Sequence, residues 1–128
     1  MAMGRGSVNL VLLSFLLVMI CAPRRTLADT HIVGGSQGWG FSVSYDSWAG
    51  GQSFATGDTL VFKYQAGLHN VVPVGAAGYR SCKASSSEAS RAATTGDDKF
   101  TLKKGSNYFI CSIPGHCAAG MKIQVLAQ

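Results

Sequence analysis

Four side chains in the second half of the sequence are of types that bind transition metals. Cys111, His116 and Met121 follow one another at intervals of five residues, and His69 lies in an earlier run that has the character of a strand. A thiolate, two imidazoles and a thioether favour copper, and a trigonal set of two His and one Cys with a weak axial Met is typical of electron-transfer copper sites. The sequence therefore predicts one type 1 copper ion bound by these four residues.

Zinc is the main competing metal, because zinc sites also use Cys and His. Tetrahedral zinc sites rarely include Met, which favours copper. Each donor also has an ordinary structural interpretation: Cys111 as half of a disulfide, His69 as an isolated histidine, and Met121 as a core residue. The remaining histidine, His31, begins an expected strand and is interpreted as structural or exposed.

The cysteines support the presence of one free thiolate. Of the four in the chain, Cys21 lies in a removable N-terminal segment, so Cys82, Cys111 and Cys117 remain. In an oxidising compartment two of these three are expected to pair, and metal binding gives the third a reason to stay reduced. Three pairings are possible. We favour a bridge between Cys82 and Cys117, because it leaves Cys111 at the spacing to the later donors that a ligand loop needs.

The N-terminal segment has the order of a secretory signal peptide. Arg5 precedes the largely apolar residues 8–20, and small residues at 26–28 form a cleavage-like exit before Asp29. The apolar run is shorter than the roughly 20 residues of a membrane span. We therefore expect residues 1–28 to be a signal peptide that is removed.

The rest of the chain predicts one exported domain, residues 29–128. No second long apolar stretch follows, and residues 122–128 lack the polar spacer and apolar tail of a lipid-anchor signal. We expect the product to be exported, monomeric and free of a membrane anchor. About 100 residues suffice for a single modest core.

The charge of the domain is only mildly basic. Three of the eleven Lys and Arg lie in the expected signal peptide and none of the six Asp and Glu does, so the formal charge falls from +5 to +2. This value does not favour nucleic-acid binding, which requires a clustered basic stripe. Acidic cell-wall polymers are possible partners of four lysines, Lys99, Lys103, Lys104 and Lys122.

Short runs rich in β-branched and aromatic residues alternate with turns and predict an all-β sandwich. Six such runs are residues 31–33, 59–64, 70–74, 99–102, 106–111 and 121–126. The turn at Lys104 and Gly105 suggests a hairpin between the fourth and fifth runs. Pro73 indicates an edge strand or a bulge. Residues 81–93, rich in Ala and Ser, suggest a short helix or loop.

The order of several motifs resembles that of the phytocyanins, a family of plant blue copper proteins, and most closely the plantacyanins or basic blue proteins within it. These motifs are HIVGGSQGW, GDTLVFKY, HNVV, YRSC and YFICSIPGHCAAGMKI. The resemblance implies a cupredoxin-like Greek-key β-sandwich with one or two short helices, the same four copper ligands and the bridge between Cys82 and Cys117. It also implies that Asn70 ties the two ligand segments together, and that the secreted protein lies in the apoplast or cell wall.

Two functions remain open. The first is a secreted one-electron carrier that acts with small redox partners or an unknown redox protein. The alternative is a wall-associated signalling or adhesion protein in which copper is structural or redox-sensing. An enzyme is not expected, because four protein ligands leave no open metal position for a substrate and no acid-base or nucleophilic motif is visible.

Overall fold

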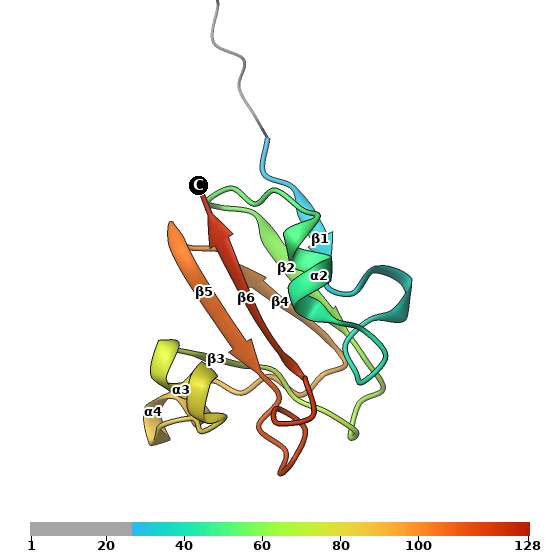
Figure 1. The fold of residues 1–128 in the computed structure, drawn as a ribbon, viewed down its shortest axis with the longest axis vertical. Coiled ribbons are helices and arrows are strands. Elements are labelled where there is room, and N and C mark those ends of the chain that lie inside the picture. Colours follow the sequence, from blue (N-terminus) through green and yellow to red (C-terminus); the bar gives the residue numbers. More distant parts are fainter. Residues whose placement is uncertain (1–26) are drawn as a thin grey trace, which may run out of the picture.

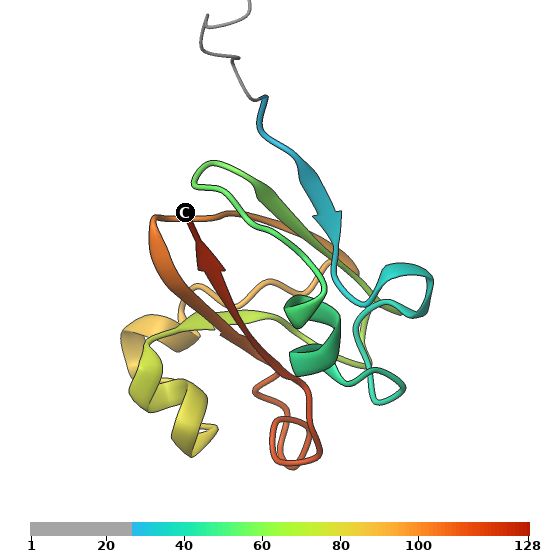
Figure 2. The same ribbon diagram turned by 45° about the horizontal axis from the view of Figure 1, so that its top comes forward.

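The computed structural model describes residues 27–128, so most of the expected signal peptide lies outside the described residues. Two three-stranded sheets form a sandwich (Figures 1 and 2). One sheet has the order β1-β2-β4, with β1 parallel and β4 antiparallel to β2, and the other has the antiparallel order β3-β5-β6. The strands are β1 (Thr30–Ile32), β2 (Thr59–Lys63), β3 (Val72–Val74), β4 (Asp97–Thr101), β5 (Gly105–Ile110) and β6 (Lys122–Ala127). All six expected strands are present, and the all-β prediction is confirmed.

The core lies between the sheets and follows from the alternation of side chains along the strands. In β6, Ile123, Val125 and Ala127 are buried while the residues between them are exposed or half-buried. Phe62 of β2 is fully buried and contacts Phe109 of β5 across the sandwich, at 5.2 Å between ring centroids. Burial of one such side chain contributes about 1.5 to 3 kcal/mol.

The prediction of a hairpin around Lys104 and Gly105 is wrong. β4 pairs with β2, whereas β5 pairs with β3 and β6, so the chain crosses from one sheet to the other between them. Leu102 anchors this crossing, because its side chain is buried, its amide donates to the Asp58 carbonyl and its own carbonyl accepts from Gly57. A turn signal shows where the chain bends, but not which strand the next segment joins.

The described residues contain three short α-helices and one 3-10 turn, more than the one or two helices expected. They are η1 (Gly35–Gln37), α2 (Tyr45–Gly50), α3 (Ala76–Ser81) and α4 (Ser86–Ala89). α4 lies in the segment predicted to be helix or loop and begins with a capping box between Ser85 and Glu88. The expectation for Pro73 is confirmed, since β3 is an edge strand that pairs only with β5. None of the helices within residues 27–128 has the length and apolar character needed to span a bilayer.

A buried carboxylate lies next to the start of β1. Asp58 is 3% exposed, and its side chain accepts hydrogen bonds from the backbone amides of Ala55 and Asp29 and from His31 Nε2, each at 2.9 Å. The amide of Ala55 and then the His31 ring have the largest effects, and together these bonds lower the pKa of Asp58 to about 2. His31 is therefore structural, as expected.

Acid should weaken the fold through this carboxylate. The pKa of Asp58 is lower in the folded state than the unperturbed value of about 3.9, so its contribution to stability is present above pH 4 and is lost as the pH falls towards 2. Denaturant titrations between pH 5 and 2 should show a falling free energy of unfolding. Asp58→Asn should flatten that fall, and an unchanged slope in this variant would contradict the assignment.

Candidate metal centre

The structure brings together three of the four predicted donors. One ligand atom from each of His69, Cys111 and His116 lies within 4.8 Å of the others. The Nδ1 atoms of the two histidines are 3.0 Å apart, and Cys111 Sγ lies 3.5 Å from His116 Nδ1. Nitrogen and sulfur atoms at these distances enclose a point that one metal ion can share, and the thiolate with two imidazoles suits a copper ion.

The donors come from two segments that are distant in the sequence. His69 lies in the connection between β2 and β3, whereas Cys111 directly follows β5 and His116 lies in the connection from β5 to β6. Two backbone hydrogen bonds hold the ends of that connection together. The Cys111 amide donates to the Met121 carbonyl, and the Met121 amide donates to the His116 carbonyl. Gly115 has φ +82°, which lets the chain turn sharply before His116.

Met121 is fully buried in the same core cluster as Cys111. Its backbone is fixed by the two hydrogen bonds that close the connection, so the residue lies at the end of the donor loop. A buried methionine also fills core space well. The role of its thioether as the axial ligand therefore stays a prediction.

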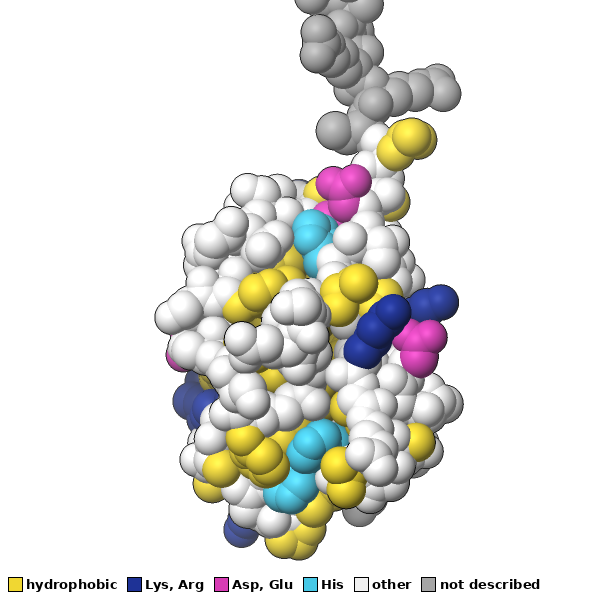
Figure 3. Space-filling model, turned by 90° about the vertical axis from the view of Figure 1, so that its right-hand side faces the viewer, with side chains coloured by type: hydrophobic (Ala, Val, Ile, Leu, Met, Phe, Trp, Pro, Cys, Tyr) yellow, Lys and Arg dark blue, Asp and Glu magenta, His cyan; other side chains and the backbone are white. Residues whose placement is uncertain are grey.

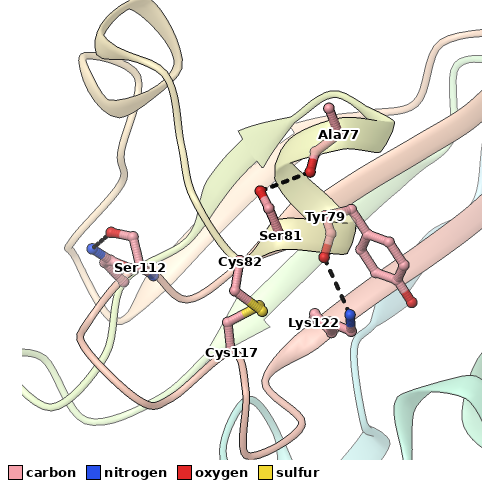
Figure 4. The surroundings of a disulfide bond; sticks show 8 residues. Ala77, Tyr79, Ser81, Cys82, Ser112, Cys117 and Lys122 are labelled. Carbon is pink, nitrogen blue, oxygen red and sulfur yellow. Dashed lines mark hydrogen bonds between the residues drawn. A yellow bond between two sulfur atoms is a disulfide. The ribbon is translucent and has the colours of Figure 1, made fainter.

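The disulfide joins the residues that were favoured from the sequence. Cys82 and Cys117 are bonded, with Cα atoms 5.6 Å apart, and Cys111 is the free cysteine of the described part of the chain. Figure 4 shows the bridge linking the end of α3 to the loop that carries His116, the residue before Cys117. The bridge fixes the donor loop against α3, and the cysteine beside the histidines remains a buried thiol.

Asn70 connects the two donor segments, as the resemblance implied. Its Oδ1 accepts from the Ser112 amide at 2.8 Å and its Nδ2 donates to Ser112 Oγ at 2.9 Å. The Asn70 carbonyl also accepts from Trp39 Nε1 at 3.0 Å. Since Asn70 follows His69 and Ser112 follows Cys111, these bonds fix the spacing between the imidazole and the thiol.

We call the two hydrogen bonds between Asn70 and Ser112 the Asn70 clamp. Its removal should lower both the stability of the fold and the metal affinity. We expect Asn70→Ala to lower the free energy of unfolding by about 1 to 2 kcal/mol, since two hydrogen bonds are lost. We also expect metal affinity to fall by about tenfold, as it does when outer partners of ligands are removed. Asn107→Ala is the matched control, because Asn107 bonds Lys103 and Gly105 within another turn. Equal loss of affinity in both variants would show that the clamp has no local role.

Burial, and secondarily the neighbouring His116 ring, lowers the pKa of His69. A neutral imidazole has a free lone pair, which is the form that binds metal. Burial, followed by the hydrogen bond to Asp98, raises the pKa of Tyr64 to about 12, and its ring lies 6.1 Å from that of His69. The phenol therefore stays neutral beside the donors over the physiological pH range.

The sequence analysis missed Phe41, which lies over both histidines. Its ring is edge-on to His69 and His116, with centroids 5.5 and 4.9 Å away, and it is 56% exposed. Leu68, next to His69, is also about half exposed. Figure 3 shows histidine side chains bordered by hydrophobic ones on this face. An exposed aromatic in the irregular segment between η1 and α2 gives no periodic signal, so only the fold relates Phe41 to the donors.

Known proteins resemble this chain over most of its length. Residues 39–121 match the model of the plastocyanin-like domain. The chain is 45% identical to chemocyanin from Lilium longiflorum over 129 residues, which cover 99% of each chain.

Two solved structures share the fold. One is the cucumber basic protein, a blue copper protein, with 43% identity, a TM-score of 0.71, and coverage of 77% of this chain and 99% of that one. The other is spinach plantacyanin, with 50% identity, a TM-score of 0.64, and coverage of 71% and 94%. These likenesses confirm the cupredoxin-like sandwich.

Proposed function

The chain belongs to the phytocyanins, blue copper proteins of plants with a plastocyanin-like domain, and from this membership we propose that it is a secreted one-electron carrier. Its cofactor is one type 1 copper ion. We assign His69, Cys111 and His116 as the equatorial ligands and Met121 as the weak axial ligand. The observation that carries the proposal is the convergence of a buried free thiol and two imidazoles within 4.8 Å.

Copper bound to this donor set would supply reversible exchange of a single electron. The role of the protein is to keep the ligand atoms at fixed positions. Three features restrict the donor loop: the hydrogen bonds from the amides of Cys111 and Met121, the Asn70 clamp and the bridge at Cys117. A rigid loop changes little between two oxidation states, which favours fast electron exchange.

Electrons are proposed to enter and leave at the apolar surface around the histidines. His69 and His116 are half-buried, whereas Cys111 is fully buried. The exposed ring of Phe41 packs against both histidines, and two further exposed apolar residues, Leu68 and Pro114, lie next to His69 and two positions before His116 in the sequence. A redox partner that displaces water from this patch would bring its own redox centre close to an imidazole edge.

A carrier differs from an enzyme in a measurable way. Four protein ligands leave no open position for a substrate. The protein should bind one copper ion per molecule. Once loaded, it should accept one electron per molecule from ascorbate and return it to an oxidant. Sustained oxygen consumption with ascorbate or phenols would contradict the carrier assignment.

His116→Gly tests one of the two half-buried proposed histidine ligands. The variant should lose most of its intense visible absorption with Cu(II), and free imidazole should restore it, because the small ligand fits the space of the removed ring. His31→Gln is the control, since His31 contacts Asp58 and not the donors, and it should keep the full absorption. Failure of imidazole to restore the absorption would remove His116 from the ligand set.

A further inference from the structure

Within the described residues, 27–128, Asp29 is the first whose backbone is hydrogen-bonded to the sandwich. Its nitrogen donates to Asp58 Oδ1 at 2.9 Å, and its carbonyl accepts from the Thr59 amide at 2.9 Å. The two described residues before it, Leu27 and Ala28, are exposed and make no hydrogen bond to the described domain. In Figure 1 the first described residues, the blue segment before β1, point away from the sandwich. The structural boundary of the domain therefore coincides with the cleavage-like exit in the sequence.

We propose that Asp58 is a receptor site for the N-terminus created by cleavage after Ala28, and that the α-ammonium group of Asp29 forms a partly buried ion pair with its carboxylate. In the cleavage, water adds across the Ala28–Asp29 peptide bond under the action of a signal-peptide-removing protease. Ala28 leaves as a carboxylate, and the released amine of Asp29 takes up a proton. The Asp29 nitrogen is already in place, so no rearrangement of the domain is needed.

The receptor site is built before cleavage. The Asp58 side chain is almost fully buried, and its other contacts are the Ala55 amide and His31 Nε2. His31 packs against Phe54, at 4.7 Å between ring centroids. The Asp58 backbone carbonyl accepts from Leu102, which fixes the residue at the crossing between the sheets. The carboxylate position is thus set independently of Asp29.

Cleavage changes the strength of the contact rather than its geometry. Before cleavage a neutral amide donates to the carboxylate, and afterwards a cation does so. Charge-assisted hydrogen bonds are roughly twice as strong as neutral ones. Hydrogen bonds already hold the pKa of Asp58 at about 2, so the carboxylate is ionised wherever the amine is protonated.

The pairing predicts a defined pH dependence. The α-amino pKa in the unfolded chain is about 7.7 to 8.0, and pairing raises it in the folded chain. The added stability is therefore fully present below pH 7 and is lost as the pH rises through the folded pKa. A rise of about one unit corresponds to a roughly tenfold change in the unfolding equilibrium constant. Other charges on the surrounding segments are His31, the Asp29 side chain and Lys103, and they cancel in a comparison that alters only the amine.

The experiment compares two proteins secreted from full-length precursors. One is the natural chain, and the other has a glycine inserted between Ala28 and Asp29, which moves the amine one residue away and makes the Asp29 nitrogen an amide again. N-terminal sequencing should find Asp29 first in the natural protein. At about pH 6.5 the unfolding equilibrium constant of the natural protein should be about tenfold smaller than that of the protein with the inserted glycine. This difference should disappear above about pH 10.

Two further measurements separate this pair from other effects. Asp58→Asn should remove the difference between the two proteins, whereas Asp98→Asn, at a buried carboxylate that bonds Tyr64 and Thr95 instead, should preserve it. If Asp58→Asn does not fold, NMR titration of the α-amine in the natural protein gives the answer directly, because its pKa must lie above 8. A different first residue, an unshifted pKa, or an equal stability difference at every pH would overturn the proposal.

Discussion

Cys111→Ser is expected to abolish the intense visible absorption of the copper-loaded protein. That absorption arises from charge transfer between a thiolate and Cu(II), and a serine hydroxyl cannot supply it. Cys111 is the free cysteine of the described residues, since Cys82 and Cys117 are bonded to each other. No other thiolate in that part of the chain can take its place. Absorption spectra after addition of one equivalent of Cu(II) give the measurement.

Met121→Leu is the matched comparison for that experiment. Both residues are fully buried, so both substitutions test the same part of the core. Because the axial ligand of a blue copper site is weakly bound and tunes the redox potential, the leucine variant should keep strong absorption and change its potential. Full absorption in Cys111→Ser would remove the thiolate from the site, and an unchanged potential in Met121→Leu would remove the thioether.

Removal of the disulfide should give the largest loss of stability. The bridge closes a loop with a sequence separation of 35 residues, and the chain-entropy account assigns about 3 to 4 kcal/mol to such a loop. We expect Cys82→Ala combined with Cys117→Ala to lower the free energy of unfolding by about this amount in urea titrations. The double variant is required, because either single variant leaves a thiol that can react with Cys111.

The same double variant separates stability from metal binding. His116 precedes Cys117, but its backbone is also fixed by hydrogen bonds to Ile113 and Met121. We therefore expect the double variant to retain its visible absorption under conditions in which it is folded. A loss of stability below about 1 kcal/mol would contradict the structural role of the bridge.

Local patterns predicted the strands well and the helices poorly. The run from Thr59 to Tyr64 has the β-branched and aromatic residues that a strand requires, and β2 occupies nearly all of it. α3 begins at Ala76 after Gly75, without a capping side chain, so no start signal marks it. The crossing at Leu102 was missed because strand pairing depends on contacts with segments far away in the sequence.

The donor residues could be predicted because their chemistry is rare, whereas their surroundings could not. Cys111 and His116 stand out by type and spacing, and the odd number of cysteines identifies one free thiol. The Asn70 role came from family resemblance. The contact of Phe41 with both imidazoles and the bond from Asp29 to Asp58 arise only when distant segments meet in the fold.

The location of His69 has a consequence for the mechanics of the whole sandwich. It lies on the connection that carries the chain from β2 in one sheet to β3 in the other, while Cys111 and His116 belong to the second sheet's connection. An ion that binds all three therefore fastens the two layers together at one end. Binding to the folded form alone stabilises that form, by an amount that grows with the logarithm of the free copper concentration above the Kd. Separation of the layers at this end would therefore require at least one of these ligands to leave the ion.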